Sequence, residues 1–133
     1  MATILVVDDD ESMRLLLRGY LLSAGYDVLV AEDAIVAGHL ILRGAPDLMI
    51  LDVNMPYMDG FEFARALAAD PTLPFIPIIF LTVRTDGFDR AMELGAVAYV
   101  MKPISAHDLV ATVRRHVPPD KPPVMTDWEE LHR

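Results

Sequence analysis

The sequence of 133 residues contains no cysteine. Disulfides and thiolate metal sites are therefore excluded, and the composition suits a reducing compartment, so we expect a cytoplasmic protein. Although 53% of the residues are hydrophobic, no apolar run approaches the roughly 18 residues of a membrane span. The first ten residues lack a basic segment and soon reach acids, which does not fit a signal peptide. We expect no membrane association.

Basic residues are also scarce. Eleven lysines and arginines stand against 20 acidic residues, for a formal net charge of −9, which disfavours direct binding of nucleic acid by this chain. Residues 1–117 contain eight arginines but a single lysine, Lys102. Such a lysine is ordinarily a solvated surface residue. Because the chain otherwise uses arginine, the compact ammonium of Lys102 makes it a candidate functional residue.

Short apolar runs alternate with segments of helical spacing along most of the chain. The expected strands cover residues 4–7, 27–31, 47–51, 76–81 and 97–101, and the expected helices cover residues 12–24, 33–43, 61–69, 86–94 and 105–117. Runs that are apolar throughout suit strands buried on both faces. Five strand–helix repeats with short connections predict an α/β fold over residues 1–117, a (βα)5 doubly wound five-stranded parallel sheet of the flavodoxin-like type.

Residues suited to phosphoryl chemistry stand where the predicted strands end. Asp8 and Asp9 follow the first strand, Asp52 the third, Thr82 the fourth and Lys102 the fifth. The carboxyl ends of parallel strands share one edge, where ligands bind. Close carboxylates repel one another unless a cation joins them, and oxygen ligands favour Mg²⁺. Each residue alone is more often a turn or capping residue, but their coincidence at one edge favours a site.

Four motifs carry a family resemblance. They are I-L-V-V-D-D-D-E at residues 4–11, L-D-V-N-M-P-Y-M-D-G at 51–60, F-L-T at 80–82 and Y-V-M-K-P at 99–103. In this order and spacing they resemble the receiver domains of two-component response regulators, which have a chemotaxis-regulator-like fold. The resemblance covers about residues 3–117.

The resemblance implies a phosphoacceptor and a metal site. Asp52 would accept a phosphoryl group from a histidine kinase or a histidine phosphotransfer protein. Asp9 and Asp52 would bind Mg²⁺ directly together with the backbone carbonyl of Asn54, and Asp8 would help through water. Such a module catalyses only its own phosphorylation and dephosphorylation and is not otherwise an enzyme.

It also implies a switch. Thr82 and Lys102 would contact the phosphoryl group, and Tyr99 matches the aromatic residue that turns inward as Thr82 moves toward the phosphate. The change would reach the surface of the fourth helix, fifth strand and fifth helix, where an output partner binds. The Lys102–Pro103 bond is expected to be cis, as in the family.

The chain departs from the family pattern at Val83, where alanine, glycine or serine is usual. We expect this branched side chain to narrow access to Asp52, and to slow both phosphorylation by small donors and dephosphorylation. Ala98 replaces a common acid and Ile104 a frequent phenylalanine, at positions that receivers of winged-helix transcription factors often use for a shared dimer face. These departures weigh against that face, and the sequence leaves a homodimer open.

Residues 118–133 change in character. They contain four prolines and the only tryptophan, Trp128, which predicts a stiff connector with a short helical turn capped by Thr126. This tail could cover an apolar patch, lead to an output domain or dock on a partner.

Other functions remain open beside a switch that acts alone. The chain could be the receiver part of a longer transcription factor or output enzyme. A phosphatase with an aspartyl nucleophile is less favoured, because such enzymes typically have D-x-D where this chain has Asn54. A nucleotide-binding flavodoxin-like protein is disfavoured because no glycine-rich phosphate loop follows the first strand.

Overall fold

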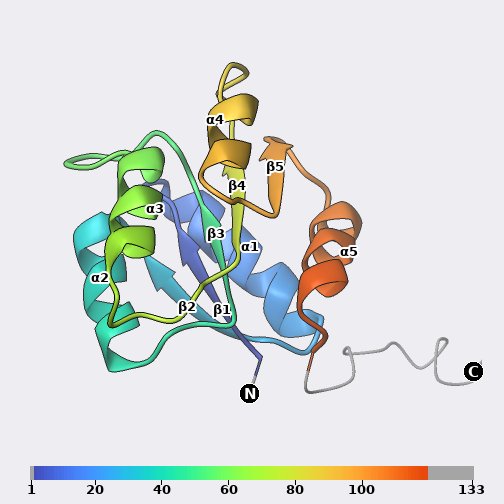
Figure 1. Cartoon of the computed structure of the whole chain (residues 1–133). Helices are drawn as coiled ribbons and strands as arrows, with labels where there is room; N and C mark the ends of the chain where they lie inside the picture. Colours follow the sequence, from blue (N-terminus) through green and yellow to red (C-terminus); the bar gives the residue numbers. More distant parts are fainter. Residues whose placement is uncertain (1, 120–133) are drawn as a thin grey trace, which may run out of the picture.

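A five-stranded parallel sheet forms the centre of the computed structural model, which describes residues 2–119 (Figure 1). The strands are β1 (Thr3–Val7), β2 (Asp27–Ala31), β3 (Leu48–Leu51), β4 (Ile78–Thr82) and β5 (Ala98–Met101). The helices are α1 (Glu11–Ser23), α2 (Ala34–Arg43), α3 (Gly60–Ala69), α4 (Phe88–Glu93) and α5 (Ala106–His116). The strand order β2-β1-β3-β4-β5 confirms the predicted doubly wound α/β fold.

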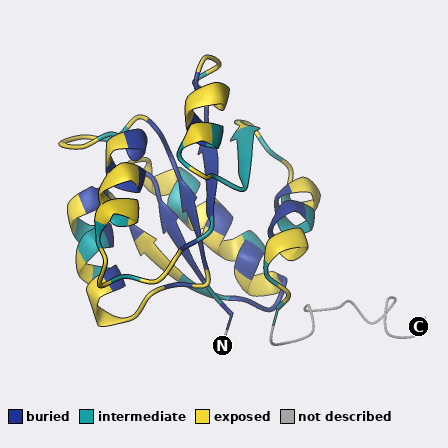
Figure 2. Cartoon of the chain, in the orientation of Figure 1, coloured by how far each residue is buried: buried dark blue, intermediate teal, exposed yellow. Residues whose placement is uncertain are grey.

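Helices cover both faces of the sheet and divide the core in two. Apolar side chains of α1 and α5 pack on one face, and those of α2, α3 and α4 pack on the other. The side chains of β1 alternate between these two clusters: Ile4 and Val6 belong to the first, Leu5 and Val7 to the second. Figure 2 shows the central strands buried between the helical layers, which explains their unbroken apolar runs.

Most predicted boundaries lie within one residue of the observed ones, and two elements, β4 and α4, begin two residues later than predicted. Strand β4 begins at Ile78 rather than residue 76, since Pro77 has no N–H to add to the ladder. Helix α4 covers only Phe88–Glu93 instead of residues 86–94. It begins after Gly87, which has no side chain for a cap. It ends at Glu93 with Leu94 as its C-cap, and Gly95 follows with a left-handed φ of 83°.

Helix ends elsewhere follow the sequence signals. Asp10 caps α1 through the Ser12 amide, and Ser105 caps α5 through the Asp108 amide at 3.1 Å. The Lys102–Pro103 peptide bond is cis, as expected. No helix within residues 2–119 is long and apolar enough to cross a membrane. The predicted helical turn around Trp128 lies outside the described residues.

Candidate functional site

The sheet brings the predicted site residues to one edge. The amide of Asp52 donates to the carbonyl of Val7 at 3.0 Å, and the amide of Lys102 donates to the carbonyl of Thr82 at 2.9 Å. Both hydrogen bonds continue the strand ladders one residue beyond the strands. Asp8, which directly follows Val7, therefore emerges beside Asp52.

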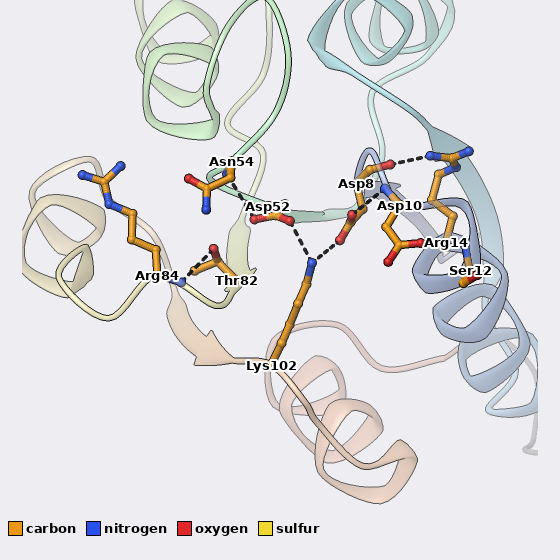
Figure 3. Close-up of polar contacts among 9 residues, drawn as sticks. All are labelled: Asp8, Asp10, Ser12, Arg14, Asp52, Asn54, Thr82, Arg84 and Lys102. Carbon is orange, nitrogen blue, oxygen red and sulfur yellow. Dashed lines mark hydrogen bonds and ion pairs between the residues drawn. The ribbon is translucent and has the colours of Figure 1, made fainter.

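Lys102 bridges two buried carboxylates. Its Nζ donates to Oδ2 of Asp8 at 2.6 Å and to Oδ2 of Asp52 at 2.8 Å (Figure 3). Asp8 is 2% exposed and Asp52 is 6% exposed. Buried carboxylates need such partners, because an unpaired buried charge is strongly unfavourable. The ammonium thus holds two acidic residues from distant parts of the chain together.

A third carboxylate completes an acidic cluster. Carboxylate oxygens of Asp8, Asp9 and Asp52 lie within 4.8 Å of one another, and Asp9 is exposed. All the donors are oxygen atoms, which suits a hard divalent cation such as Mg²⁺ better than zinc. Three carboxylates beside one ammonium also leave negative charge for such an ion to offset. The residues therefore fit Mg²⁺, and the exposed Asp9 marks the solvent side of the cluster.

Burial and pairing act on the titration of this cluster. Burial raises the pKa of the Asp8 carboxyl, and the hydrogen bonds from Lys102 and the Asp10 amide offset only part of that rise. For Lys102 burial lowers the pKa, but the contacts with Asp52 and Asp8 outweigh it, so the pKa is raised overall. The ammonium form of the lysine is therefore favoured inside the site.

Backbone contacts support the loop after β1. Nη1 of Arg14 donates to the carbonyl of Asp8 at 2.7 Å, and the Asp10 amide donates to Oδ1 of Asp8 at 3.0 Å (Figure 3). The sequence analysis missed Arg14, because an arginine in the first turns of a helix reads as an ordinary solvated residue. Asn54 lies in the loop after β3, where its backbone amide donates to Oδ1 of Asp52 at 3.2 Å.

Thr82 and Tyr99, the predicted switch residues, both contact the backbone of Arg84. The hydroxyl of the fully buried Thr82 accepts a hydrogen bond from the Arg84 amide at 3.3 Å. The hydroxyl of Tyr99 donates to the Arg84 carbonyl. The tyrosine ring lies 6.3 Å from that of Phe80, a core residue, so Tyr99 points inward. Arg84 was not singled out in the sequence, because only its backbone makes these bonds.

Val83 lies between Thr82 and Arg84 in the sequence and is 62% exposed. Its side chain therefore faces solvent at the start of the loop after β4. Its effect on access to Asp52 stays a prediction.

Comparison with known proteins agrees with the motifs. The family model for the response regulator receiver domain matches residues 4–114. The response regulator MprA of Mycobacterium sp. (strain KMS) is 40% identical over 125 residues, which cover 90% of this chain and 54% of MprA. The DNA-binding response regulator MtrA of Mycolicibacterium smegmatis is 42% identical over 113 residues, which cover 84% of this chain and 48% of MtrA. The chain thus spans about half the length of these curated relatives.

A solved structure extends the likeness to the fold. The chemotaxis response regulator CheY4 of Vibrio cholerae has a TM-score of 0.80 and 35% sequence identity, covering 88% of this chain and 99% of CheY4. The family model matches nearly all of the described residues, and a chemotaxis response regulator superimposes on them over 99% of its length. The chain therefore belongs to the family of response regulator receiver domains of two-component systems.

Proposed function

We propose that this receiver domain is a phosphorylation-dependent switch in which Asp52 accepts a phosphoryl group from a histidine kinase or a histidine phosphotransfer protein. The observation that carries the proposal is the pair of hydrogen bonds from Lys102 to Asp8 and Asp52. An ammonium 2.8 Å from the Asp52 carboxylate supports this proposal, because it would be close enough to contact an incoming phosphoryl oxygen.

The acidic cluster is the proposed Mg²⁺ site. Asp9 and Asp52 would hold the ion directly with the backbone carbonyl of Asn54, and Asp8 would act through water. When bound, the ion supplies positive charge that offsets the phosphoryl oxygens. Carboxylate oxygens within 4.8 Å of one another support this assignment.

Phosphoryl transfer then uses the Asp52 carboxylate as nucleophile. A carboxylate oxygen attacks phosphorus in line with the donor nitrogen, an O–P bond forms, and the P–N bond breaks with its electron pair left on the imidazole. Lys102 would contact one phosphoryl oxygen and the Thr82 hydroxyl would donate to another. These fixed donors stabilise charge as it develops, at little reorganisation cost.

The readout passes through Thr82 and Tyr99. When the Thr82 hydroxyl turns to the phosphoryl group, its hydrogen bond from the Arg84 amide is lost. The loop around Arg84, whose carbonyl accepts a hydrogen bond from Tyr99, then changes conformation. Phe88 of α4 is 55% exposed and Met101 of β5 is 38% exposed. These apolar residues belong to the surface of α4, β5 and α5 on which we propose that the output partner binds.

The test is incubation with Mg²⁺ and acetyl phosphate, followed by intact-mass measurement, with Asp52→Asn as control. The parent should gain one phosphoryl group that the variant does not gain. Modification that persists in Asp52→Asn would place the acceptor elsewhere. Sustained turnover of phosphate esters by the parent would instead favour a phosphatase.

A second candidate is a role as the receiver part of a longer regulator. The observation that favours it is that the chain covers only 54% of MprA and 48% of MtrA, and MtrA is described as DNA-binding. Specific binding of the full gene product to promoter DNA would support this role. Sedimentation of the receiver with and without beryllium fluoride would show whether it forms the homodimer that the sequence left open.

A further inference from the structure

Residue 87 has to be glycine because neighbouring side chains leave no room for a Cβ atom, and not because of its backbone conformation. Its φ of −99° and ψ of −2° are open to any residue. A Cβ atom at this position would lie 2.5 Å from the hydroxyl oxygen of Tyr99 and 2.7 Å from Cζ of Phe61. Both distances are far inside van der Waals contact. The missing side chain therefore leaves a volume beside Gly87 that the inward ring of Tyr99 uses, and we call this volume the slot.

The surroundings decide which ring would yield to a side chain at residue 87. Phe61 is 1% exposed and packs edge-on to Phe80 with 5.1 Å between centroids. The guanidinium groups of Arg84 and Arg90 lie 5.5 Å and 5.2 Å from the Phe61 centroid, which adds cation–π attraction. Tyr99 is only partly buried, so it has an outward path that Phe61 lacks.

We propose that Gly87 is a positioning residue that sets the balance between the inward and outward positions of Tyr99. This inference rests on the proposed function, since it takes Tyr99 as the switch aromatic. With space at residue 87, the ring lies inward before any phosphoryl group is present. A ligand shifts an equilibrium only by its differential affinity for the two states. Because the Tyr99 ring already favours the inward position, phosphorylation has to supply less free energy to complete its rotation.

The next residue carries the position of the ring to the surface. Phe88 packs edge-on to Tyr99 with 6.3 Å between centroids, and it is 55% exposed on α4. An outward tyrosine would remove this contact and change the apolar surface offered to a partner. The space beside Gly87 therefore bears on an exposed aromatic side chain of α4, because the Tyr99 ring contacts both Gly87 and Phe88.

The test compares Gly87→Ala with Gly38→Ala. Gly38 lies in α2 and a Cβ there would meet no heavy atom within 4 Å, so this control adds the same methyl group without a clash. The first readout is the set of NMR resonances of the Tyr99 ring, which are assigned by comparison with Tyr99→Phe. The ring currents of Phe80 and Phe88 shift these resonances, so they report the position of the ring. The second is the apparent affinity for beryllium fluoride with Mg²⁺.

We expect Gly87→Ala to move the Tyr99 resonances toward those of an exposed tyrosine. Because coupling between two sites is reciprocal, the affinity for beryllium fluoride should fall about tenfold, equal to ~1.4 kcal/mol. Gly38→Ala should change neither readout. Unchanged resonances and affinity in Gly87→Ala would overturn the proposal.

A double-mutant cycle covers the case in which Gly87→Ala does not fold. Urea unfolding is then compared for Tyr99→Ala with and without Gly87→Ala. A loss of stability that becomes smaller without the Tyr99 ring assigns that part of the clash to the ring, whereas a loss that stays the same size assigns the whole clash to Phe61 and overturns the proposal. If the parent does not bind beryllium fluoride, the proposed function fails, while the ring resonances still test the slot by themselves.

Discussion

Replacement of Lys102 by methionine should destabilise the fold through charge and not through packing. Methionine keeps most of the apolar stem of the lysine but removes the ammonium. That ammonium lies 2.6 Å from Asp8 and 2.8 Å from Asp52. The variant therefore leaves two buried carboxylates facing one another, with Asp9 close by.

The structure sets the size of the effect. Breaking a buried ion pair by removing one partner typically costs about 3–5 kcal/mol. The side chain of Lys102 is 12% exposed, and Asp9 opens the cluster to solvent, so screening reduces this figure. We expect a loss of about 2–4 kcal/mol in the free energy of unfolding at pH 7 without Mg²⁺, a large part of the roughly 5–15 kcal/mol of a typical domain.

The pH dependence separates charge from packing. Burial already raises the pKa of Asp8 above its ordinary value of 3.8, and loss of the ammonium raises it further. A carboxyl with a raised pKa binds its proton more tightly in the folded state, so stability increases as pH falls through the folded pKa. The deficit of Lys102→Met should therefore shrink as pH falls from 7 toward 4. Mg²⁺ should also stabilise the variant more than the parent, since the ion can replace the lost cation.

The assay is urea unfolding followed by far-UV circular dichroism at several pH values, with and without Mg²⁺. Arg65→Met is the matched control, because Arg65 is an exposed cation on α3 and should change stability by less than about 0.5 kcal/mol. A deficit of equal size at pH 7 and pH 4 that Mg²⁺ does not reduce would refute the reasoning.

Three further changes test other parts of the molecule. Gly60→Ala should cost more than about 3 kcal/mol in urea unfolding, because its Cβ would lie 2.2 Å from the backbone oxygen of Asp52. Tyr26→Phe loses the 2.6 Å hydrogen bond to the carbonyl of Val117, which should cost about 1 kcal/mol near neutral pH. Burial raises the pKa of Tyr26, so its contribution is present below the unfolded value of 10.0 and is lost as pH rises through the folded pKa; stability curves above pH 10 should therefore converge. Val83→Ala should speed both phosphorylation by acetyl phosphate and dephosphorylation, and equal rates would contradict the access role of this side chain.

The sheet and its acidic edge could be predicted because both depend on short-range patterns. A strand buried on both faces needs an unbroken apolar run, and its first polar residue then marks the edge. Asp8, Asp52 and Lys102 were found in this way, since parallel strands must end together. Boundaries failed where backbone chemistry outweighed the pattern, as at Pro77 and Gly87. The Asp59–Glu62 capping box of α3 was not predicted, although D-G-F-E at residues 59–62 shows it.

The supporting contacts could not be predicted because they use groups without a sequence signature. Arg14 donates to a backbone carbonyl. The backbone of Arg84 donates through its amide to Thr82 and accepts through its carbonyl from Tyr99. Gly87 acts through an absent side chain. Such roles depend on approaches between distant segments, and only the folded chain shows them.

The hydrogen bond between Arg84 and Thr82 is long, and this bears on how the proposed switch starts. The bond from the Arg84 amide to Thr82 measures 3.3 Å, beyond the usual length of an N–H···O bond, so the Thr82 hydroxyl gives up little when it turns away. A phosphoryl group on Asp52 would add about one further negative charge and strong acceptor oxygens, a better partner for that hydroxyl. Tyr99 donates a hydrogen bond to the Arg84 carbonyl and occupies the space beside Gly87. An outward movement would cost it both the hydrogen bond and this packing. The threonine is therefore the element free to respond first, and the tyrosine fixes the surface that the response produces.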